Sequence, residues 1–253
     1  MTETWNALPP VSVVVPVLDE QDNVEPLYRE IRSALGPVTE HEIIFVDDGS
    51  RDATPDRLRR LAEEPESRLR VVRHPRPFGQ SAAVRSGVLA ARHAWIATLD
   101  GDRQNDPQDL VDMLQRAAAR GPGAPQVLFI GHRVNRRDSG MKRFASRFAN
   151  GLRSRLLRDG TPDTGCGIKL FPRDLFLRLP YFDHMHRFLP ALVQREGGEA
   201  VSVPVHHRAR EEGRSKYGII DRALAGAWDL LGVAWLISRS PRDYNAREVK
   251  PGE

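Results

Sequence analysis

Short apolar runs alternate with amphipathic stretches through the first half of the chain. β-Branched runs predict buried strands, and apolar positions repeating every three or four residues predict helices. The expected strands span 11–17, 43–46, 69–72, 95–99 and 127–130. The expected helices span 22–35, 80–92 and 107–120, and one more begins at Thr54-Pro55, with Thr54 as its N-cap. This alternation predicts an α/β fold with a mostly parallel central sheet and helices on both faces.

The alternation stops after residue 131, but the sequence shows no second domain boundary, internal repeat or low-complexity tract. Residues 1–240 are therefore expected to form a single domain, and 241–253 a polar, disordered tail. The only cysteine, Cys166, excludes an internal disulfide and fits a reducing cytoplasm. Residues 1–10 contain no apolar run, so no signal peptide is expected.

Two later segments are candidates for contact with a membrane surface. Residues 132–158 hold nine Lys and Arg against one acid, Asp138, within a chain of net charge +4. Such a basic patch points to an anionic partner. Within it, helical spacing places apolar residues on one stripe: Met141, Phe144, Ala145, Phe148, Leu152 and Leu156. This pattern fits either a surface helix packed on the core or an interfacial helix facing lipid headgroups.

The longest apolar tract, 219–237, contains Trp228 and Trp235 but is interrupted by charged residues. A membrane span needs about 20 mostly apolar residues, so we expect no transmembrane helix here. The tract fits either a buried core helix or a second interfacial helix.

Acidic residues follow three of the expected strands. Asp19-Glu20 follows the first strand, Asp47-Asp48 the second and Asp100-Gly101-Asp102 the fourth. In open parallel sheets, ligands bind outside the carboxyl ends of the strands. Three separate strands are thus expected to direct carboxylates to one rim.

The segment LDGDRQNDP, residues 99–107, carries the most specific of these clusters. Asp100 and Asp102 are one residue apart, so in extended backbone both carboxylates point to one side. Mg²⁺ and Mn²⁺ favour such oxygen ligands, usually one or two carboxylates together with phosphate oxygens and water. An acidic turn is the structural alternative. Asp106, which precedes a proline, is expected to act as a helix N-cap, with Asp109 in the first turn.

Taken together, VPVLDE (15–20), VDDGS (46–50) and LDGDRQNDP (99–107) resemble the nucleotide-sugar half of family-2 glycosyltransferases, which have the GT-A fold. DTGCGIKLF (163–171), HHRAREEGRSKYG (206–218) and RRDSGMKRFASRFANGL (136–152) resemble the dolichyl-phosphate and undecaprenyl-phosphate sugar transferase branch. The resemblance implies a single-domain GT-A fold with added amphipathic interfacial helices. Its nucleotide-sugar half would be 11–131, and its acceptor and membrane-interface half 132–240.

The resemblance also implies roles for matched positions. It assigns the nucleoside contacts to Pro16, Leu18, Glu20, Val46 and Asp48. Asp100, Gly101 and Asp102 would lie against the diphosphate and its Mg²⁺ or Mn²⁺, and Gln104 would face the metal or the sugar. Arg210 and Lys216 would bind the phosphates. The motif departs from many relatives at Leu18, where an aromatic is frequent, and at Arg103 and Asp106, where leucine and proline are common.

Acceptor residues are less specific. Asp163 lies near the position of a base in other family-2 enzymes, and its structural alternative is capping the Asp163-Thr164-Gly165 turn. Arg133 and Arg147 are candidates for gripping an acceptor phosphate, because arginine binds phosphate in a fork geometry. A solvated basic face is the alternative for both.

The sequence thus predicts a metal-dependent, inverting glycosyltransferase that moves a sugar from a GDP- or UDP-sugar to polyprenyl phosphate. We expect it to be cytoplasmic and peripheral on the inner face of the cytoplasmic membrane, and leave open a homo-oligomer or a membrane-protein partner. A glycan or protein acceptor is the alternative within the same class. A catalytically silent nucleotide-sugar-binding protein is another. Nucleic-acid binding is disfavoured, because the basic segment lacks interleaved tyrosine or tryptophan and acids crowd the strand ends.

Overall fold

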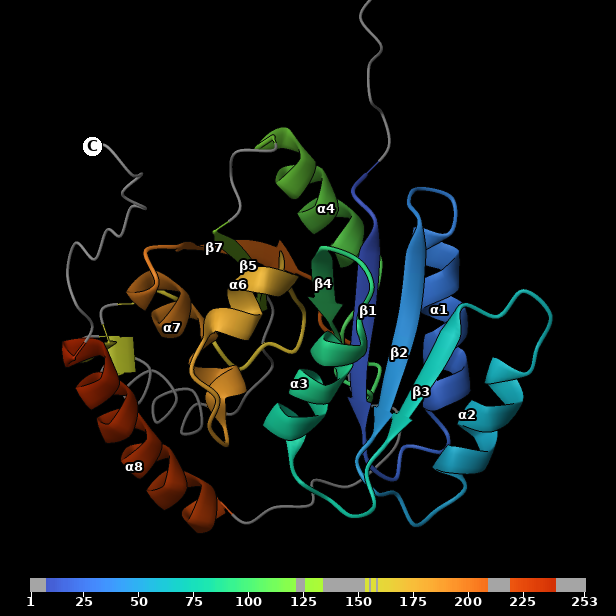
Figure 1. The fold of residues 1–253 in the computed structure, drawn as a ribbon, viewed down its shortest axis with the longest axis horizontal. Coiled ribbons are helices and arrows are strands. Elements are labelled where there is room, and N and C mark those ends of the chain that lie inside the picture. Colours follow the sequence, from blue (N-terminus) through green and yellow to red (C-terminus); the bar gives the residue numbers. More distant parts are fainter. Residues whose placement is uncertain are drawn as a thin grey trace, which may run out of the picture.

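The computed structural model describes residues 8–121, 126–133, 153–154, 156–157, 159–208 and 219–239. One seven-stranded sheet, in the order β3-β2-β1-β4-β6-β5-β7, organises the fold (Figure 1). Its strands are β1 (Val11–Val17), β2 (His41–Asp47), β3 (Leu69–Arg73), β4 (Trp95–Thr98), β5 (Val127–Arg133), β6 (Lys169–Pro172) and β7 (Glu199–Val205). Only β6 runs against its neighbours, so the sheet is mostly parallel, as predicted.

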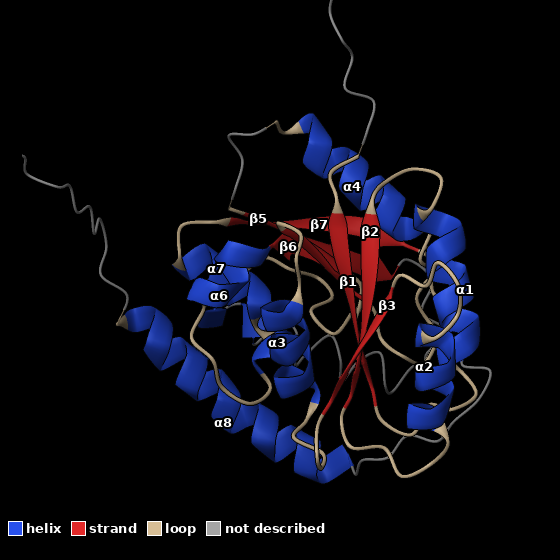
Figure 2. Cartoon of the chain, turned by 45° about the vertical axis from the view of Figure 1, so that its right-hand side comes forward, coloured by secondary structure: helices blue, strands red, loops and turns tan. Residues whose placement is uncertain are grey.

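Helices cover both faces of this sheet (Figure 2). One face carries α1 (Val24–Leu35), α2 (Thr54–Ala62) and α4 (Asp109–Ala119). The other carries α3 (Gln80–Ala90), α6 (Arg173–Arg178) and α7 (Leu189–Arg195), with the short 3-10 helix η1 (Met185–Arg187) and the outlying α8 (Ile219–Ser238).

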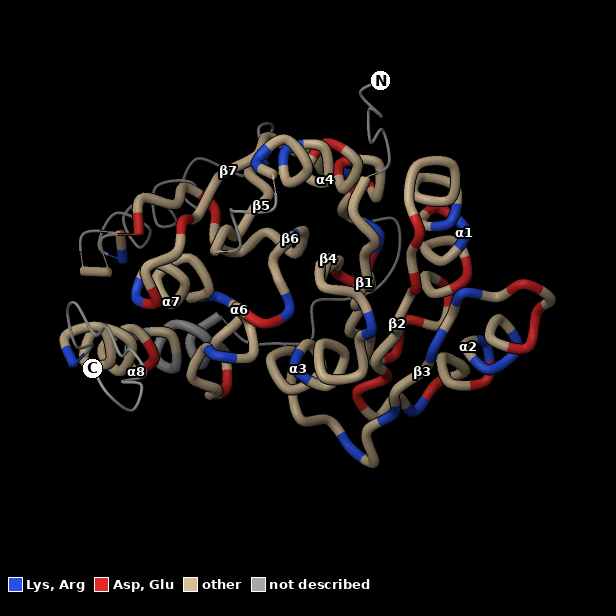
Figure 3. The backbone as a smooth tube through the Cα atoms, turned by 45° about the horizontal axis from the view of Figure 1, so that its top comes forward, with Lys and Arg blue, Asp and Glu red and all other residues tan. Residues whose placement is uncertain are grey.

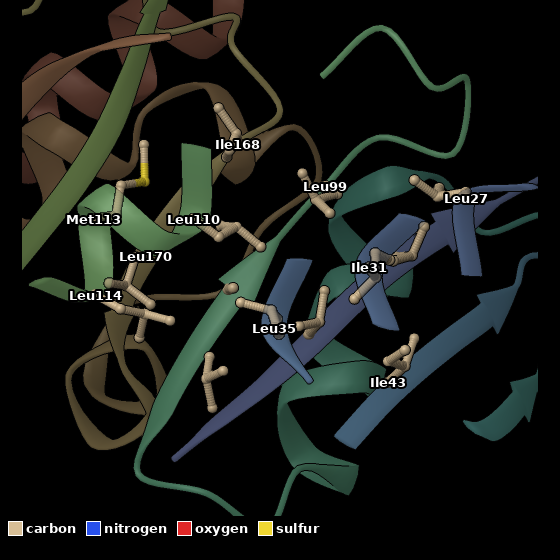
Figure 4. Packing of buried hydrophobic residues seen from close by; sticks show 14 of the residues in the cluster. Leu27, Ile31, Leu35, Ile43, Leu99, Leu110, Met113, Leu114, Ile168 and Leu170 are labelled. Atoms are coloured by element: carbon tan, nitrogen blue, oxygen red, sulfur yellow. The ribbon is translucent and has the colours of Figure 1, made fainter. Parts of the chain in front are cut away.

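The alternation of side chains along β1 explains the two layers. Val13 and Val15 belong to the core under α1, whereas Val14 belongs to the core under α3. Figure 4 shows the first of these cores, where apolar side chains of α1 and α4, among them Ile31 and Leu110, pack over the same face of the sheet. Because β1 is buried on both faces, it reads in the sequence as a continuous apolar run.

The predicted elements of residues 11–131 are confirmed, with small shifts of their ends. Two strands were missed, β6 and β7. β6 has only four residues and begins with a lysine, and β7 is an edge strand containing Pro204, so neither gives a strong apolar run. The sheet therefore continues beyond the point where the sequence pattern changes.

Two capping predictions are wrong in detail. Thr54 is the first residue of α2, whose N-cap position is Ala53, and the Thr54 hydroxyl instead accepts a hydrogen bond from the Glu20 amide at 2.9 Å. The N-cap position of α4 is Gln108 rather than Asp106. The Asp106 carboxylate still accepts a hydrogen bond from the Gln108 amide at 3.0 Å, so it shapes the turn before the helix.

Gly87 generates a prediction about packing between α3 and the sheet. A Cβ added at this position would clash with Val14 Cγ1 and lie 3.1 Å from Val46 Cγ2, both fully buried. Alanine favours helix by about 1 kcal/mol over glycine, but overpacking a core typically costs about 1–3 kcal/mol. We expect Gly87→Ala to lower the Tm by about 2–4 °C, the shift that ~1 kcal/mol produces at this size.

Gly232 provides the matched control, since it also lies within a helix but an added Cβ there meets nothing within 4 Å. Gly232→Ala should leave the Tm unchanged or raise it. Equal thermal shifts for the two variants, measured by calorimetry, would contradict the packing argument.

Candidate active site

Three parallel strands bring the predicted acidic turns to one edge of the sheet. β1 pairs in parallel with β2 on one side and with β4 on the other. The arrowheads of β1, β2 and β3 accordingly point to the same edge in Figure 1. Asp48 follows β2, and Asp100 to Asp102 follow β4, so the predicted rim exists.

Asp100 is held in place from two sides. Its Oδ1 accepts a hydrogen bond from Gln80 Nε2, at the start of α3, at 2.8 Å. On the other side lies Gly167, where any Cβ would overlap the Asp100 carboxylate. Burial, and then the negative charge of Asp102, raise the pKa of Asp100, while the Lys169 ammonium acts in the opposite direction. An added cation would relieve this repulsion between carboxylates.

The two carboxylates fit a Mg²⁺ or Mn²⁺ site that is completed by a ligand. Within the described ranges, no group of three or more His, Cys, Asp or Glu is arranged to hold a metal ion. Mg²⁺ is typically bound by one or two carboxylates together with substrate phosphates and water. Asp100 and Asp102 match that pattern, and Gly101 between them packs against Val17 and the Pro16 carbonyl.

A small pocket opens beside Asp100 and contains polar residues that the sequence did not single out. Its walls include Pro16, Gln80, Asp100, Lys169 and His186. The Lys169 ammonium donates to the Cys166 carbonyl, and burial lowers its pKa. Burial also lowers the pKa of His186 to about 3, so this imidazole is neutral at physiological pH.

Gln80, Lys169 and His186 were therefore missed as site residues. Lys169 lies in the quoted DTGCGIK segment, which was a signal for it. Gln80 and His186 carry no motif. His186 reaches the pocket from η1, where its Nδ1 lies 2.7 Å from Ser81 Oγ of α3.

The loop after β1 is tied to the loop after β2. The Asp19 amide donates to Ser50 Oγ at 2.9 Å, and the Arg51 amide donates to Asp19 Oδ1 at 2.8 Å. Leu18 and Glu20 lie on this tied loop and are partly exposed, as is Pro16 at the end of β1. The Glu20 carboxylate accepts a hydrogen bond from Asn23 Nδ2 at 2.7 Å. These residues, which are predicted to contact the nucleoside of the sugar donor, thus lie at the same edge of the sheet.

The other two residues predicted to contact the nucleoside are Val46 and Asp48, and both make contacts within the protein. Val46 is fully buried under α3. The Asp48 carboxylate accepts hydrogen bonds from the amides of Phe78 at 2.9 Å and Gly79 at 2.8 Å, and lies 2.7 Å from His74 Nδ1. Asp48 therefore shapes the loop between β3 and α3, which leads directly to Gln80.

Arg133 and Asp163, predicted separately, form one bidentate ion pair. Arg133 Nε donates to Asp163 Oδ2 at 2.6 Å, and Nη2 donates to Oδ1 at 2.8 Å. Both side chains are largely buried. Hydrogen bonding to Asp163 raises the pKa of Arg133, which is also attracted by Asp100. The pair therefore lies within the electrostatic reach of the acidic rim.

The segment that leads to the predicted phosphate-binding residues lies against the loop after β4. The Arg208 amide donates to the Gln104 carbonyl at 2.9 Å, and Asn105 forms an antiparallel bridge with His207. The Gln104 amide in turn donates to Asp102 Oδ1 at 3.2 Å. Arg210, Lys216 and Arg147 lie outside the described residues.

Most of the basic segment also lies outside the described residues, but one of its nine cations, Arg153, is described and is turned inward. The Arg153 side chain is buried and donates to the Thr161 carbonyl at 2.6 Å, and Nη1 lies 3.5 Å from Asp159 Oδ2. It therefore faces the protein rather than a lipid surface. Burial lowers its pKa, whereas Asp159 acts to raise it.

α8, which covers the tract 219–237, is buried on one face and exposed on the other. Val233 is buried in the core beside α7, and Asp229 faces the protein, 2.8 Å from His184 Nδ1. The opposite face exposes Trp228, Leu231 and Trp235 by 75%, 55% and 61%. α8 is mostly uncharged in Figure 3. None of the helices in the described part of the chain is long and apolar enough to cross a membrane.

Comparison with known proteins agrees with this geometry. Residues 12–179 match the family model of Glycosyl transferase family 2. The chain is 36% identical to dodecaprenyl-phosphate galacturonate synthase of Rhizobium johnstonii over 240 residues, which cover 92% of this chain and 68% of the relative. It is 33% identical to undecaprenyl-phosphate 4-deoxy-4-formamido-L-arabinose transferase of Edwardsiella ictaluri over 211 residues, 83% of this chain and 63% of that protein.

A solved structure shares the fold at lower sequence identity. Glucosyl-3-phosphoglycerate synthase of Mycobacterium tuberculosis, crystallised with Mn²⁺, UDP and glucosyl-3-phosphoglycerate, is 19% identical with a TM-score of 0.66. The match covers 93% of this chain and 82% of that one. This likeness supports the GT-A fold predicted from the sequence. Because the family model covers most of the chain and the relatives match in sequence, the chain belongs to glycosyl transferase family 2.

Proposed function

We propose that the chain transfers a sugar, with inversion, from a UDP- or GDP-sugar to a polyprenyl phosphate at the inner face of the cytoplasmic membrane. The proposal rests on two features that lie near each other. One is the acidic rim at Asp100 and Asp102, and the other is the buried Arg133–Asp163 ion pair, which we call the Arg133–Asp163 fork. The first element suits a metal-bound diphosphate, and the second suits an anionic acceptor. The names of the two relatives, both polyprenyl-phosphate sugar enzymes, support this acceptor class.

On the donor side, Asp100 and Asp102 would hold Mg²⁺ or Mn²⁺, with Gln104 beside them. When bound, the ion neutralises charge that develops on the departing diphosphate. Gln80 fixes the Asp100 carboxylate in advance. Arg210 and Lys216 add positive charge to the leaving phosphates. Pro16, Leu18 and Glu20 form the nucleoside edge, which Val46 and Asp48 support from within.

On the acceptor side, the chemistry requires no strong general base. A phosphate monoester has a second pKa of about 6 and is largely dianionic at neutral pH. Its oxygen can attack the anomeric carbon directly while the bond to the diphosphate oxygen breaks on the opposite face. In this proposal Arg133 and Arg147 grip the acceptor phosphate, and Asp163 is a positioning residue that holds the Arg133 guanidinium in place.

α8 supports a peripheral position at the membrane. Its exposed residues Trp228, Leu231 and Trp235 are spaced to lie on one helical face, and tryptophan favours the lipid headgroup region. A long-chain polyprenyl phosphate stays in the bilayer, so its phosphate must be met at the surface. We propose that residues 132–240 form this acceptor half and 11–131 the donor half.

The direct test is a panel of UDP- and GDP-sugars offered with undecaprenyl phosphate, analysed by mass spectrometry of the lipid. A glycosyl-phosphoryl lipid formed with one donor supports the proposal. Sugar transfer to a glycan or protein alone would favour the other acceptor class, and donor binding without any transfer would favour a silent binding protein.

The metal role predicts a specific loss in Asp102→Asn. Removing one of two carboxylates should weaken Mn²⁺-dependent binding of UDP or GDP by about tenfold or more, the equivalent of ~1.4 kcal/mol. Isothermal calorimetry with and without Mn²⁺ measures this difference. Asp112→Asn, on the exposed side of α4 next to Arg116, is the control and should bind like wild type. A nucleotide affinity that is the same with and without Mn²⁺, and the same in wild type and Asp102→Asn, would rule out the proposed metal site.

The Arg133–Asp163 fork predicts how Asp163→Asn should behave. If Asp163 positions Arg133, this variant should raise the KM for polyprenyl phosphate and change kcat by less than about tenfold, because the nucleophile is already ionised. Loss of a general base typically costs about 10²–10⁴-fold in rate. Steady-state kinetics at saturating lipid distinguish the two. A kcat loss beyond 100-fold with an unchanged KM would assign Asp163 as the base.

The exposed face of α8 predicts membrane attachment. Replacing Trp228 and Trp235 by serine should strongly reduce flotation with liposomes that contain anionic lipid, while nucleotide binding is retained. Leu89→Ser is the control, because Leu89 is a comparably exposed apolar residue at the end of α3. Equal flotation of wild type, control and double variant would argue against α8 as the membrane contact.

A further inference from the structure

Four charged side chains form a continuous chain of ion pairs beside the loop after β4. Arg103 Nη2 lies 2.7 Å from Glu30 Oε1, and Arg208 Nη1 lies 2.7 Å from Glu30 Oε2. Arg208 Nη2 then lies 2.7 Å from Asp106 Oδ2. We call this set, Arg103–Glu30–Arg208–Asp106, the Glu30 network. Its centre is a glutamate of α1 that no sequence motif contains.

One end of the network controls the turn that carries Asp102. Arg103 follows Asp102 directly and has φ +59°, a left-handed conformation that residues other than glycine rarely adopt. Such a conformation costs about 1–3 kcal/mol and persists only where the surroundings hold it. The two hydrogen bonds from Arg103 Nε and Nη2 to Glu30 Oε1, at 3.2 Å and 2.7 Å, supply such a hold.

The other end of the network fastens the segment 206–208. His206 donates its amide to Asp109 Oδ2 at 2.8 Å, and its Nδ1 lies 2.8 Å from Asp109 Oδ1. Arg208 adds the main-chain bond to Gln104 and both side-chain ion pairs. Residue 210, the first of the proposed phosphate-binding cations, is only two residues further along the chain. The same carboxylate therefore joins the metal-binding loop to the start of the phosphate-binding segment.

The two ends of the network, Arg103 and Asp106, both lie in the LDGDRQNDP segment, and its members are partly shielded from solvent. Glu30 and Arg103 are only 25% and 24% exposed, so solvent screens the pair less than an ordinary surface ion pair. Without Glu30, the guanidinium of Arg103 would lose this partner one residue from Asp102 in the chain, where it would compete with a divalent cation for the carboxylate.

We infer that Glu30 is a positioning residue for the donor site: it holds the Asp102 turn and the 206–208 segment in one arrangement and neutralises the arginine beside the metal-binding carboxylates. The inference rests on the proposed donor site but adds a residue to it. Glu30 touches neither substrate nor metal in this scheme and acts through Arg103 and Arg208.

The test measures Mn²⁺-dependent binding of UDP and of GDP by isothermal calorimetry, with no turnover required. Glu30→Gln keeps the shape but removes the charge, and should weaken the Mn²⁺-dependent affinity about tenfold, the equivalent of ~1.4 kcal/mol. Glu25→Gln is the matched control, because Glu25 lies in the same helix but pairs weakly with Arg29, at 3.7 Å. It should bind like wild type and keep the wild-type Tm.

A second substitution separates electrostatics from simple folding. In the Glu30→Gln background, Arg103→Leu removes the guanidinium that has lost Glu30 as a partner and should recover most of the Mn²⁺-dependent affinity. Failure to recover, or a Glu30→Gln affinity equal to wild type, overturns the inference while leaving the proposed function intact. If Glu30→Gln does not fold, Arg208→Gln tests the same network and should also weaken binding several-fold. Wild-type protein that binds neither UDP nor GDP with Mn²⁺ overturns both proposals.

Discussion

The parallel pairing of β1 with β2 on one side and β4 on the other is the constraint on which the site depends. Parallel strands end at the same edge of the sheet, so the pairing alone brings the turns after them close together. Each turn carries carboxylates, which need hydrogen-bond donors or cations as partners. Asp48 finds its partners in the loop before α3, whereas Asp100 and Asp102 remain close enough to repel each other.

The loop before β6 surrounds Asp100 with residues that accommodate this repulsion. The loop before β6 brings Gly167 against Asp100, where no side chain could fit, and brings Lys169 into the same pocket. The antiparallel strand β6 is what returns this loop to the rim between β4 and β5. A strand of only four residues thereby supplies the cation that partly offsets the negative charge of Asp100.

Ion pairs around the rim differ in what they do. The Arg133–Asp163 fork is buried and bidentate, a geometry that fixes the guanidinium in one orientation. The Glu30 network is partly exposed and links three segments that lie far apart in the sequence. α8, beyond this rim, keeps its one described acid turned inward to His184 and leaves an apolar face outward.

The sequence by itself determined the α/β class, five of the strands and the acidic rim, because apolar periodicity and strand-end carboxylates are local properties of the chain. The ordered motifs also indicated the family. Tertiary structure alone decided that Gln80, Lys169 and His186 reach the Asp100 pocket, that Arg133 and Asp163 are one pair, and that Arg153 is buried. It also placed Glu30 between Arg103 and Arg208, residues 73 and 178 positions away from it along the chain. No local sequence pattern predicts such contacts, because the strand order of the sheet determines which loops become neighbours.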